Sequence, residues 1–293
     1  MEFTTVLLLI TSVVTMALPS VIKKFYKGKT PFFLSSISCA FSAILFLFFS
    51  GFKFSFDLNL LVYSGLISLT FGCSTVFSLL AFTCGDLSLT GLIMSLSLII
   101  PTLYGIIFLS NPVGVFFFIG LIALIVSLFL INLKIKSKGD TNDKTITKKK
   151  FNIKWLIFIS IAAVCNGFSS IIQTEQQLVY QGQKKIELML LAFVIVSITT
   201  LIISLFTERK FIKEKLLHTT IIGGSAGIAT AVLNYVVMVL VGLVDAALLF
   251  PLISGGSLLI IFVAAPILFK EKYKPLQYVG FALGLLSVVL LNL

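Results

Sequence analysis

The sequence predicts an all-α integral membrane protein with ten transmembrane helices, arranged as two inverted five-helix repeats. Three observations predict it: an apolar composition, ten long apolar stretches, and one lysine-rich break near the middle of the chain. Of the 293 residues, 58% are hydrophobic and 11% are charged, and the mean hydropathy is +1.15. A soluble domain cannot cover that much apolar surface with polar groups, so a lipid bilayer is the expected surrounding.

The ten helices follow from length and composition. A helix needs about 20 mostly apolar residues to cross roughly 30 Å of hydrocarbon. The predicted helices run near residues 2–22, 31–50, 58–83, 88–109, 113–133, 155–178, 186–206, 216–241, 244–267 and 275–293. Positive charge follows the first stretch instead of preceding it, which favours a retained helix over a cleaved signal peptide. Asp86 and Asp245 precede the fourth and ninth stretches and are predicted to cap those helices.

The lysine-rich break at residues 134–154 divides the chain. It contains eight lysines and two acids, so we expect a solvated linker on one side of the membrane. It separates a first repeat, residues 1–133, from a second repeat, residues 155–293. Because five is an odd number of helices, the second repeat enters the membrane in the opposite sense. Residues 120–133 and 280–293 share five identical positions at an offset of 160, which supports the repeat.

The basic residues predict the orientation. All 22 lysines and arginines except Lys53, Lys184 and Lys185 fall on the linker side of the predicted helices. The positive-inside rule therefore places the linker in the cytoplasm and both termini outside. These residues flank lipid instead of forming one face, so the net charge of +11 does not indicate a nucleic-acid partner.

Polar side chains within the predicted helices are the candidate substrate contacts, since each must find a partner inside hydrocarbon. In the sixth stretch four of them have the i, i+3, i+4, i+7 spacing of one helical face: Asn166, Ser169, Ser170 and Gln173. The eighth stretch presents a matching face: Ala226, Thr230, Asn234 and Tyr235. Hydroxyl-rich parts of the third and first stretches add Ser74 and Thr15. Hydrogen bonding between helices is the alternative role, and both readings stay open.

Ionisable groups are scarce in the apolar stretches, where a charge at the bilayer centre costs about 3 kcal/mol on insertion scales. Glu175 comes nearest, toward the outer end of the sixth stretch, and is the candidate for binding a substrate cation or a coupling proton. The sole histidine, His218, and the lack of clustered carboxylates predict neither a catalytic site nor a metal site. We accordingly expect no cofactor and no enzymatic activity.

Proline and glycine are the candidate moving parts. Pro101 with Gly105, and Pro251 with Gly255, are predicted to interrupt the fourth and ninth stretches at corresponding places in the two repeats. Helices broken in corresponding places point to the gate or site of an inverted-repeat carrier, and plain packing kinks are the alternative. Two GxxxG spacings, at Gly223 with Gly227 and at Gly280 with Gly284, predict close helix approach.

The organisation in two five-helix repeats, with an ending that contains LVDAALLFPLISGGSLLIIFVAAPILFKEKYKPLQYVGFALGLLSVVLL, resembles the EamA-type branch of the drug/metabolite transporter superfamily. The resemblance is most specific from about residue 234 onward, where Glu271, Gln277 and Gly280 follow the family's pattern. The first repeat departs from it, because FLSNPVGVFF has no acidic turn. Members of the family commonly have both termini in the cytoplasm, whereas the distribution of lysines here places both termini outside. We keep the orientation that the lysines predict.

The resemblance implies a secondary transporter that moves a small organic solute, such as an amino acid, a related metabolite or a drug-like compound, mostly outward. It implies a multi-pass protein of the bacterial inner membrane and makes Asn166, Gln173, Asn234 and Tyr235 the preferred substrate contacts. The alternatives are a lipid-precursor flippase of the same superfamily, a non-transporting membrane subunit and a membrane-embedded enzyme. A homodimer is left open.

Overall fold

The structure is a computed structural model that describes residues 3–26, 30–84, 93–94, 97, 99–111, 113–132, 153–212, 216–269 and 275–290. Over these ranges the secondary structure is helical, with turns between the helices and no strand. The helices are α1 (Phe3–Lys24), α2 (Pro31–Phe49), α3 (Leu58–Cys84), α5 (Ile99–Ile107), α6 (Val115–Asn132), α7 (Ile153–Val179), α8 (Lys185–Thr207), α9 (Arg209–Ile212), α10 (Leu216–Leu240), α11 (Ala246–Phe269) and α12 (Pro275–Leu290).

The length and apolarity of these helices define a multi-pass membrane protein. Within the described ranges, six segments are long and apolar enough to span a bilayer: Pro31–Phe49, Leu58–Ser78, Ile153–Val179, Lys185–Thr207, Leu216–Leu240 and Ala246–Leu268. Shorter apolar segments lie in α1, α6 and α12. The prediction of an all-α membrane protein is therefore confirmed, whereas the count of ten transmembrane helices remains a prediction.

The helix ends agree with the predicted stretches to within a few residues, with three qualifications. The fourth stretch, predicted at 88–109, is described as a helix at Ile99–Ile107, and Asp86 lies outside the described residues. Most of the predicted linker also lies outside them, and its last two residues, Ile153 and Lys154, form the start of α7, so the division of the chain at the linker remains a prediction. The short helix α9 was not predicted, because four residues carry no periodic signal.

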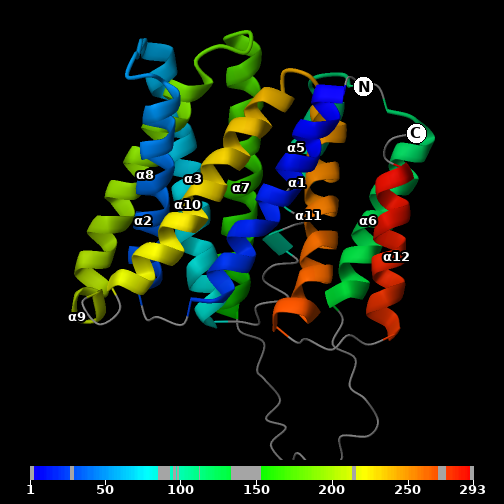
Figure 1. Ribbon diagram of the computed structural model, residues 1–293. Helices are drawn as coiled ribbons and strands as arrows, with labels where there is room; N and C mark the ends of the chain where they lie inside the picture. Colours follow the sequence, from blue (N-terminus) through cyan, green and yellow to red (C-terminus); the bar gives the residue numbers. More distant parts are fainter. Residues whose placement is uncertain are drawn as a thin grey trace, which may run out of the picture.

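Helices from before and after the linker are interleaved in one bundle (Figure 1). Each helix before the linker packs against helices that follow it: α1 on α10 and α11, α2 on α8 and α10, α3 on α7 and α8, α5 on α7 and α11, and α6 on α12. In Figure 1 the α2–α8 pair stands at one edge of the bundle and the α6–α12 pair at the other, and α1 begins at the same end at which α12 finishes.

Small residues allow the closest of these contacts. A Cβ atom on Gly227 of α10 would lie 2.2 Å from the carbonyl oxygen of Ser38 on α2, and the Ser42 hydroxyl donates to the Gly227 carbonyl at 2.8 Å. In the α6–α12 pair, the Ser127 hydroxyl donates to the Gly280 carbonyl at 2.6 Å, and a Cβ on Gly284 would lie 2.6 Å from the same hydroxyl oxygen. The close approach predicted from the GxxxG spacings is thus confirmed at these glycines.

Polar bonds join α2 and α8 at two places. In the second turn of α2, the Ser36 hydroxyl donates to the Ser197 carbonyl oxygen, and the Ser197 hydroxyl donates to the Ser36 carbonyl oxygen, both at 3.0 Å. At the end where α2 begins, the Glu208 carboxylate accepts the backbone N–H groups of Phe32 and Phe33, both at 2.9 Å. Glu208 therefore caps the first turn of α2, since Thr30 makes no side-chain cap bond there.

Candidate substrate site

The polar face predicted for the sixth stretch lies on α7, which packs against α3 and α5 inside the bundle. The Asn166 amide donates to the Ser97 hydroxyl at 2.7 Å. Two turns along α7, Gln173 is only 7% exposed, and Ser169 between them is 2% exposed. These side chains therefore face protein and not lipid.

Ser169 differs from the other hydroxyl groups of α7. Ser170 and Thr174 each donate to a carbonyl four residues earlier, Asn166 and Ser170 respectively, as hydroxyls in membrane helices commonly do. Within the described part of the chain, the buried Ser169 hydroxyl has no hydrogen-bond partner. A buried polar atom without a partner is uncommon, which makes this position suited to receive a hydrogen bond from a ligand or a water molecule.

Glu175 lies one turn before the end of α7 and is half-buried. The Tyr104 hydroxyl of α5 donates to its Oε1 atom in a short hydrogen bond. The Tyr104 ring stacks on Phe108 with centroids 5.1 Å apart. Sequence analysis named Glu175 but missed Tyr104, because nothing in the sequence pairs residues of the fourth and sixth stretches.

A second carboxylate–phenol pair lies at the same end of the bundle, outside the helices. The Tyr180 hydroxyl donates to the Asp57 carboxylate at 2.5 Å, and the Tyr180 ring lies 6.4 Å from that of Tyr63 on α3. This bond lowers the pKa of Asp57, with smaller lowering contributions from the Leu60 backbone N–H and from Lys184. Desolvation and the bond to Asp57 raise the pKa of Tyr180 to about 12, so its hydroxyl remains a donor at pH 7.

The other predicted contacts form a second group around α10. The Asn234 amide donates to the Thr230 carbonyl of its own helix at 2.8 Å, and the Thr15 hydroxyl of α1 donates to the Thr11 carbonyl at 2.7 Å. The Tyr235 ring lies 5.5 Å from that of Phe49 at the end of α2. These groups already have partners or packing within single helices or helix pairs, so the structure gives them less capacity for a ligand than the α7 face.

Ser74 of α3 is buried at 3% exposure, on the helix that packs against α7. The helices that carry the two groups, α7 and α10, also contact each other. The structure thus brings Asn166, Gln173 and Ser74 onto neighbouring helices, with Asn234, Tyr235 and Thr15 on the adjoining ones.

Of the candidate moving parts, the ninth stretch differs from prediction. Helix α11 runs without a break from Ala246 to Phe269 and includes both Pro251 and Gly255. Proline removes one backbone N–H bond, and the packing of α11 on α1 and α5 holds the helix together across that loss. Softening at Pro251 remains a prediction. Pro101 lies in the first turn of α5, where proline is tolerated.

Gly105 marks a tight junction between α5 and α11. A Cβ atom there would lie 2.7 Å from the Asn111 side-chain oxygen and 2.8 Å from the Ala247 backbone nitrogen. The Asn111 amide donates to the Asp245 carboxylate at 3.1 Å, and its oxygen accepts the Ala247 N–H at 3.4 Å. Asp245 precedes α11, and its backbone carbonyl accepts the Leu248 and Leu249 N–H groups. The side-chain cap comes from Asn111 and not, as predicted, from the Asp245 carboxylate, which is engaged by the Asn111 amide.

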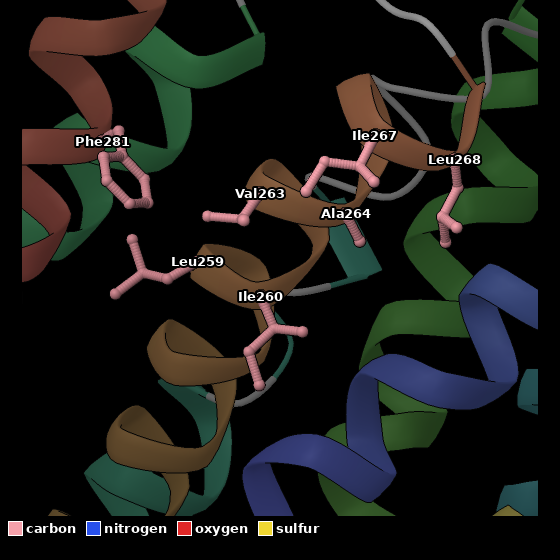
Figure 2. Close-up of a pocket in the computed structure, with 7 residues that line it drawn as sticks. All are labelled: Leu259, Ile260, Val263, Ala264, Ile267, Leu268 and Phe281. Atoms are coloured by element: carbon pink, nitrogen blue, oxygen red, sulfur yellow. The ribbon is translucent and has the colours of Figure 1, made fainter.

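An apolar groove of about 530 Å³ opens along α11 beside α12 (Figure 2). It is lined by Leu259, Ile260, Val263, Ala264, Ile267, Leu268 and Phe281. Figure 2 shows Phe281 across from the Leu259 and Val263 side chains. The groove offers no hydrogen-bonding side chain, so it is a separate feature from the polar face of α7.

The fold and these groups define an all-helical, multi-pass membrane protein with buried polar side chains between its helices. Along its whole length it has the fold of a solved structure described only as "Crystal structure of protein", with a TM-score of 0.72, 11% sequence identity, and coverage of 100% of this chain and 99% of that one. It is one of 28 matching solved chains. No family model and no curated protein matches the sequence. At this identity the likeness carries the fold alone.

Proposed function

We propose that this protein is a secondary transporter that moves a small organic solute across the bacterial inner membrane by alternating access, in the direction of export. The solute would be an amino acid, a related metabolite or a drug-like compound, as the resemblance to EamA-type transporters implies. The observation that carries the proposal is the polar face of α7, where Ser169 and Gln173 are buried, Asn166 bonds to Ser97, and the Ser169 hydroxyl has no hydrogen-bond partner among the described residues.

The packing pattern supports an inverted repeat. If α1, α2, α3, α5 and α6 are matched in order with α7, α8, α10, α11 and α12, each contact between the halves maps onto another one. The α1–α10 contact maps onto α7–α3, α1–α11 onto α7–α5, and α2–α10 onto α8–α3. The pairs α2–α8, α5–α11 and α6–α12 map onto themselves. This is the pattern of two similar units related by a twofold axis, which lets one unit rock against the other around a central site.

Transport by proteoliposomes tests the proposal. A solute is first found by thermal shift across amino acids, nucleosides, vitamins and cationic drugs, because a ligand of the folded state raises the melting temperature. Uptake of that solute is then compared between the wild type and Asn166→Ala, Gln173→Ala and Asn234→Ala. Ser225→Ala is the matched control, since Ser225 is exposed on α10 and bonds to the Ile221 carbonyl of its own helix.

We expect at least a tenfold loss of uptake for Asn166→Ala and Gln173→Ala, a smaller loss for Asn234→Ala, and normal uptake for the control. Unchanged uptake of every transported solute by all three site variants would refute the site. Failure of the wild type to move any solute that it binds would refute the transport function.

The second candidate is a lipid-precursor flippase, and one observation favours it. The groove along α11 is entirely apolar and open, as a path for an acyl chain would be. Val263→Trp would fill the groove. A loss of flipping of a fluorescent lipid-linked sugar by that variant, with uptake of water-soluble solutes absent in the wild type, would favour the flippase.

A further inference from the structure

Glu175 occupies an unusual position in the proposed transporter. Of the acids in the described residues, only Glu175 and Glu187 lie within helices long and apolar enough to span a membrane, and Glu187 is in the first turn of α8. Glu175 lies four residues before the end of α7, about 6 Å inward along the helix axis. A half-buried carboxylate at this depth requires partners, because apolar surroundings disfavour its charge.

Its partner is a neutral group. In the described part of the chain the recorded partner of Glu175 is the Tyr104 hydroxyl, and no lysine or arginine there pairs with it. A carboxylate has roughly four acceptor positions on its two oxygens, so a single phenol leaves most of them available. The negative charge is also left without a balancing cation, which a ligand could supply.

The surroundings of this carboxylate suit an organic cation. The Tyr104 ring, whose hydroxyl bonds to this carboxylate, stacks on Phe108, so aromatic side chains lie beside the charge. Ammonium groups bind favourably to a carboxylate and to aromatic faces together. The charge of Glu175 would repel an anionic solute.

The Tyr104–Glu175 bond joins α5 to α7 near the outer end of α7, whereas Asn166 bonds to Ser97, which precedes α5. Tyr104 lies between Pro101 and Gly105 on α5, a described helix of nine residues. A small movement of α5 would withdraw the phenol from the carboxylate while α7 stays in place, and a charged donor could take its position.

We propose that Glu175 binds the protonated amine of the transported solute, at the position that the Tyr104 hydroxyl occupies in this structure. The substrate class is then a small organic cation or a zwitterion with an ammonium group. This inference rests on the proposed transport function.

Matched ligands test the charge requirement. Butylamine, phenethylamine and tyramine are each compared with their N-acetyl derivatives, by thermal shift and by isothermal titration of the full-length protein in detergent at pH 7. We expect at least one amine to raise the melting temperature while its N-acetyl derivative does not. Glu175→Gln should weaken binding of that amine at least tenfold, and the control Glu187→Gln should leave it within twofold.

Tyr104→Phe separates binding from structural support. It keeps the ring and frees the carboxylate, so amine affinity should stay equal or rise up to threefold. If the Tyr104–Glu175 bond only joins helices, Tyr104→Phe and Glu175→Gln will lower the melting temperature of the ligand-free protein and leave amine binding unchanged, which overturns the proposal.

Two further outcomes also overturn the proposal. The first is that amines and their N-acetyl derivatives bind equally well. The second is that the Glu175→Gln variant still binds the amine but its transport no longer responds to a pH gradient, which would make Glu175 a proton site. Transport is judged separately. If a bound amine depends on Glu175 but proteoliposomes do not accumulate it, the ammonium site stands and the transport function falls. If neutral solutes are transported regardless of Glu175, the function stands and the site falls.

Discussion

Replacing Glu208 with alanine should destabilise the protein by about 2–3 kcal/mol, because this carboxylate caps α2 from a distant part of the chain. Glu208 is only 5% exposed, and it accepts the Phe32 and Phe33 N–H groups at 2.9 Å each. Losing a helix cap costs about 0.5–2 kcal/mol, and a buried donor left without a partner costs about 1–3 kcal/mol. Together these costs span about 1.5–5 kcal/mol, and we expect a value near the lower end because water at the helix end can hydrogen-bond to part of the freed backbone.

The assay is equilibrium unfolding in mixed micelles, followed by helical circular dichroism. Glu208→Gln keeps one acceptor oxygen and should lose about half as much stability. Thr207→Ala, at the residue next to Glu208, is the control. The Thr207 side chain is exposed and bonds to the Ile203 carbonyl of its own helix, so its replacement should change the unfolding free energy by no more than about 0.5 kcal/mol. If Glu208→Ala has the same unfolding free energy as the control, the carboxylate does not stabilise the first turn of α2 and the reasoning is wrong.

Three further predictions concern pH dependence and helix packing. Burial raises the pKa of Glu208, and its two N–H bonds oppose that rise, so the folded state holds the Glu208 proton more tightly than the unfolded state. The stability that this proton contributes is full below pH 4.5 and is lost as pH rises through the folded pKa, and Glu208→Gln should abolish this pH dependence of the melting temperature. The pKa of Asp57 is lowered, chiefly by the Tyr180 hydroxyl, so the contribution of Asp57 to folding stability is present above pH 3.8 and is lost as pH falls through the folded pKa. Tyr180→Phe should therefore reduce the loss of melting temperature in acid. Gly227→Ala should cost about 3 kcal/mol of unfolding free energy, because its Cβ would lie 2.2 Å from a carbonyl oxygen, whereas Gly65→Ala, with open space around the Cβ, should be neutral or stabilising.

The sequence predicts the helices well because their length and apolarity are set locally. The stretch predicted at residues 186–206 is the helix Lys185–Thr207, and the face of Asn166 and Gln173 is buried as its spacing indicated. Partners from distant segments are a different matter. Neither Ser97 for Asn166 nor Tyr104 for Glu175 could be found, because periodicity specifies which face of a helix is polar but not which helix it meets.

The buried prolines show a second limit. Pro251 suggested an interrupted helix, since proline disfavours a helix interior, but α11 continues through it. Tertiary context can outweigh local propensity of this kind, and Pro251 is buried within the bundle.

The mutual hydrogen bonds of Ser36 and Ser197 also fix how α2 and α8 are placed along each other. Each serine donates through its hydroxyl and accepts through its carbonyl, so the two bonds at 3.0 Å form a reciprocal pair. A slide of one helix past the other by a single turn, about 5.4 Å, would break both bonds at once. The register of this helix pair is therefore all-or-none, which one bond in a single direction would enforce less strictly.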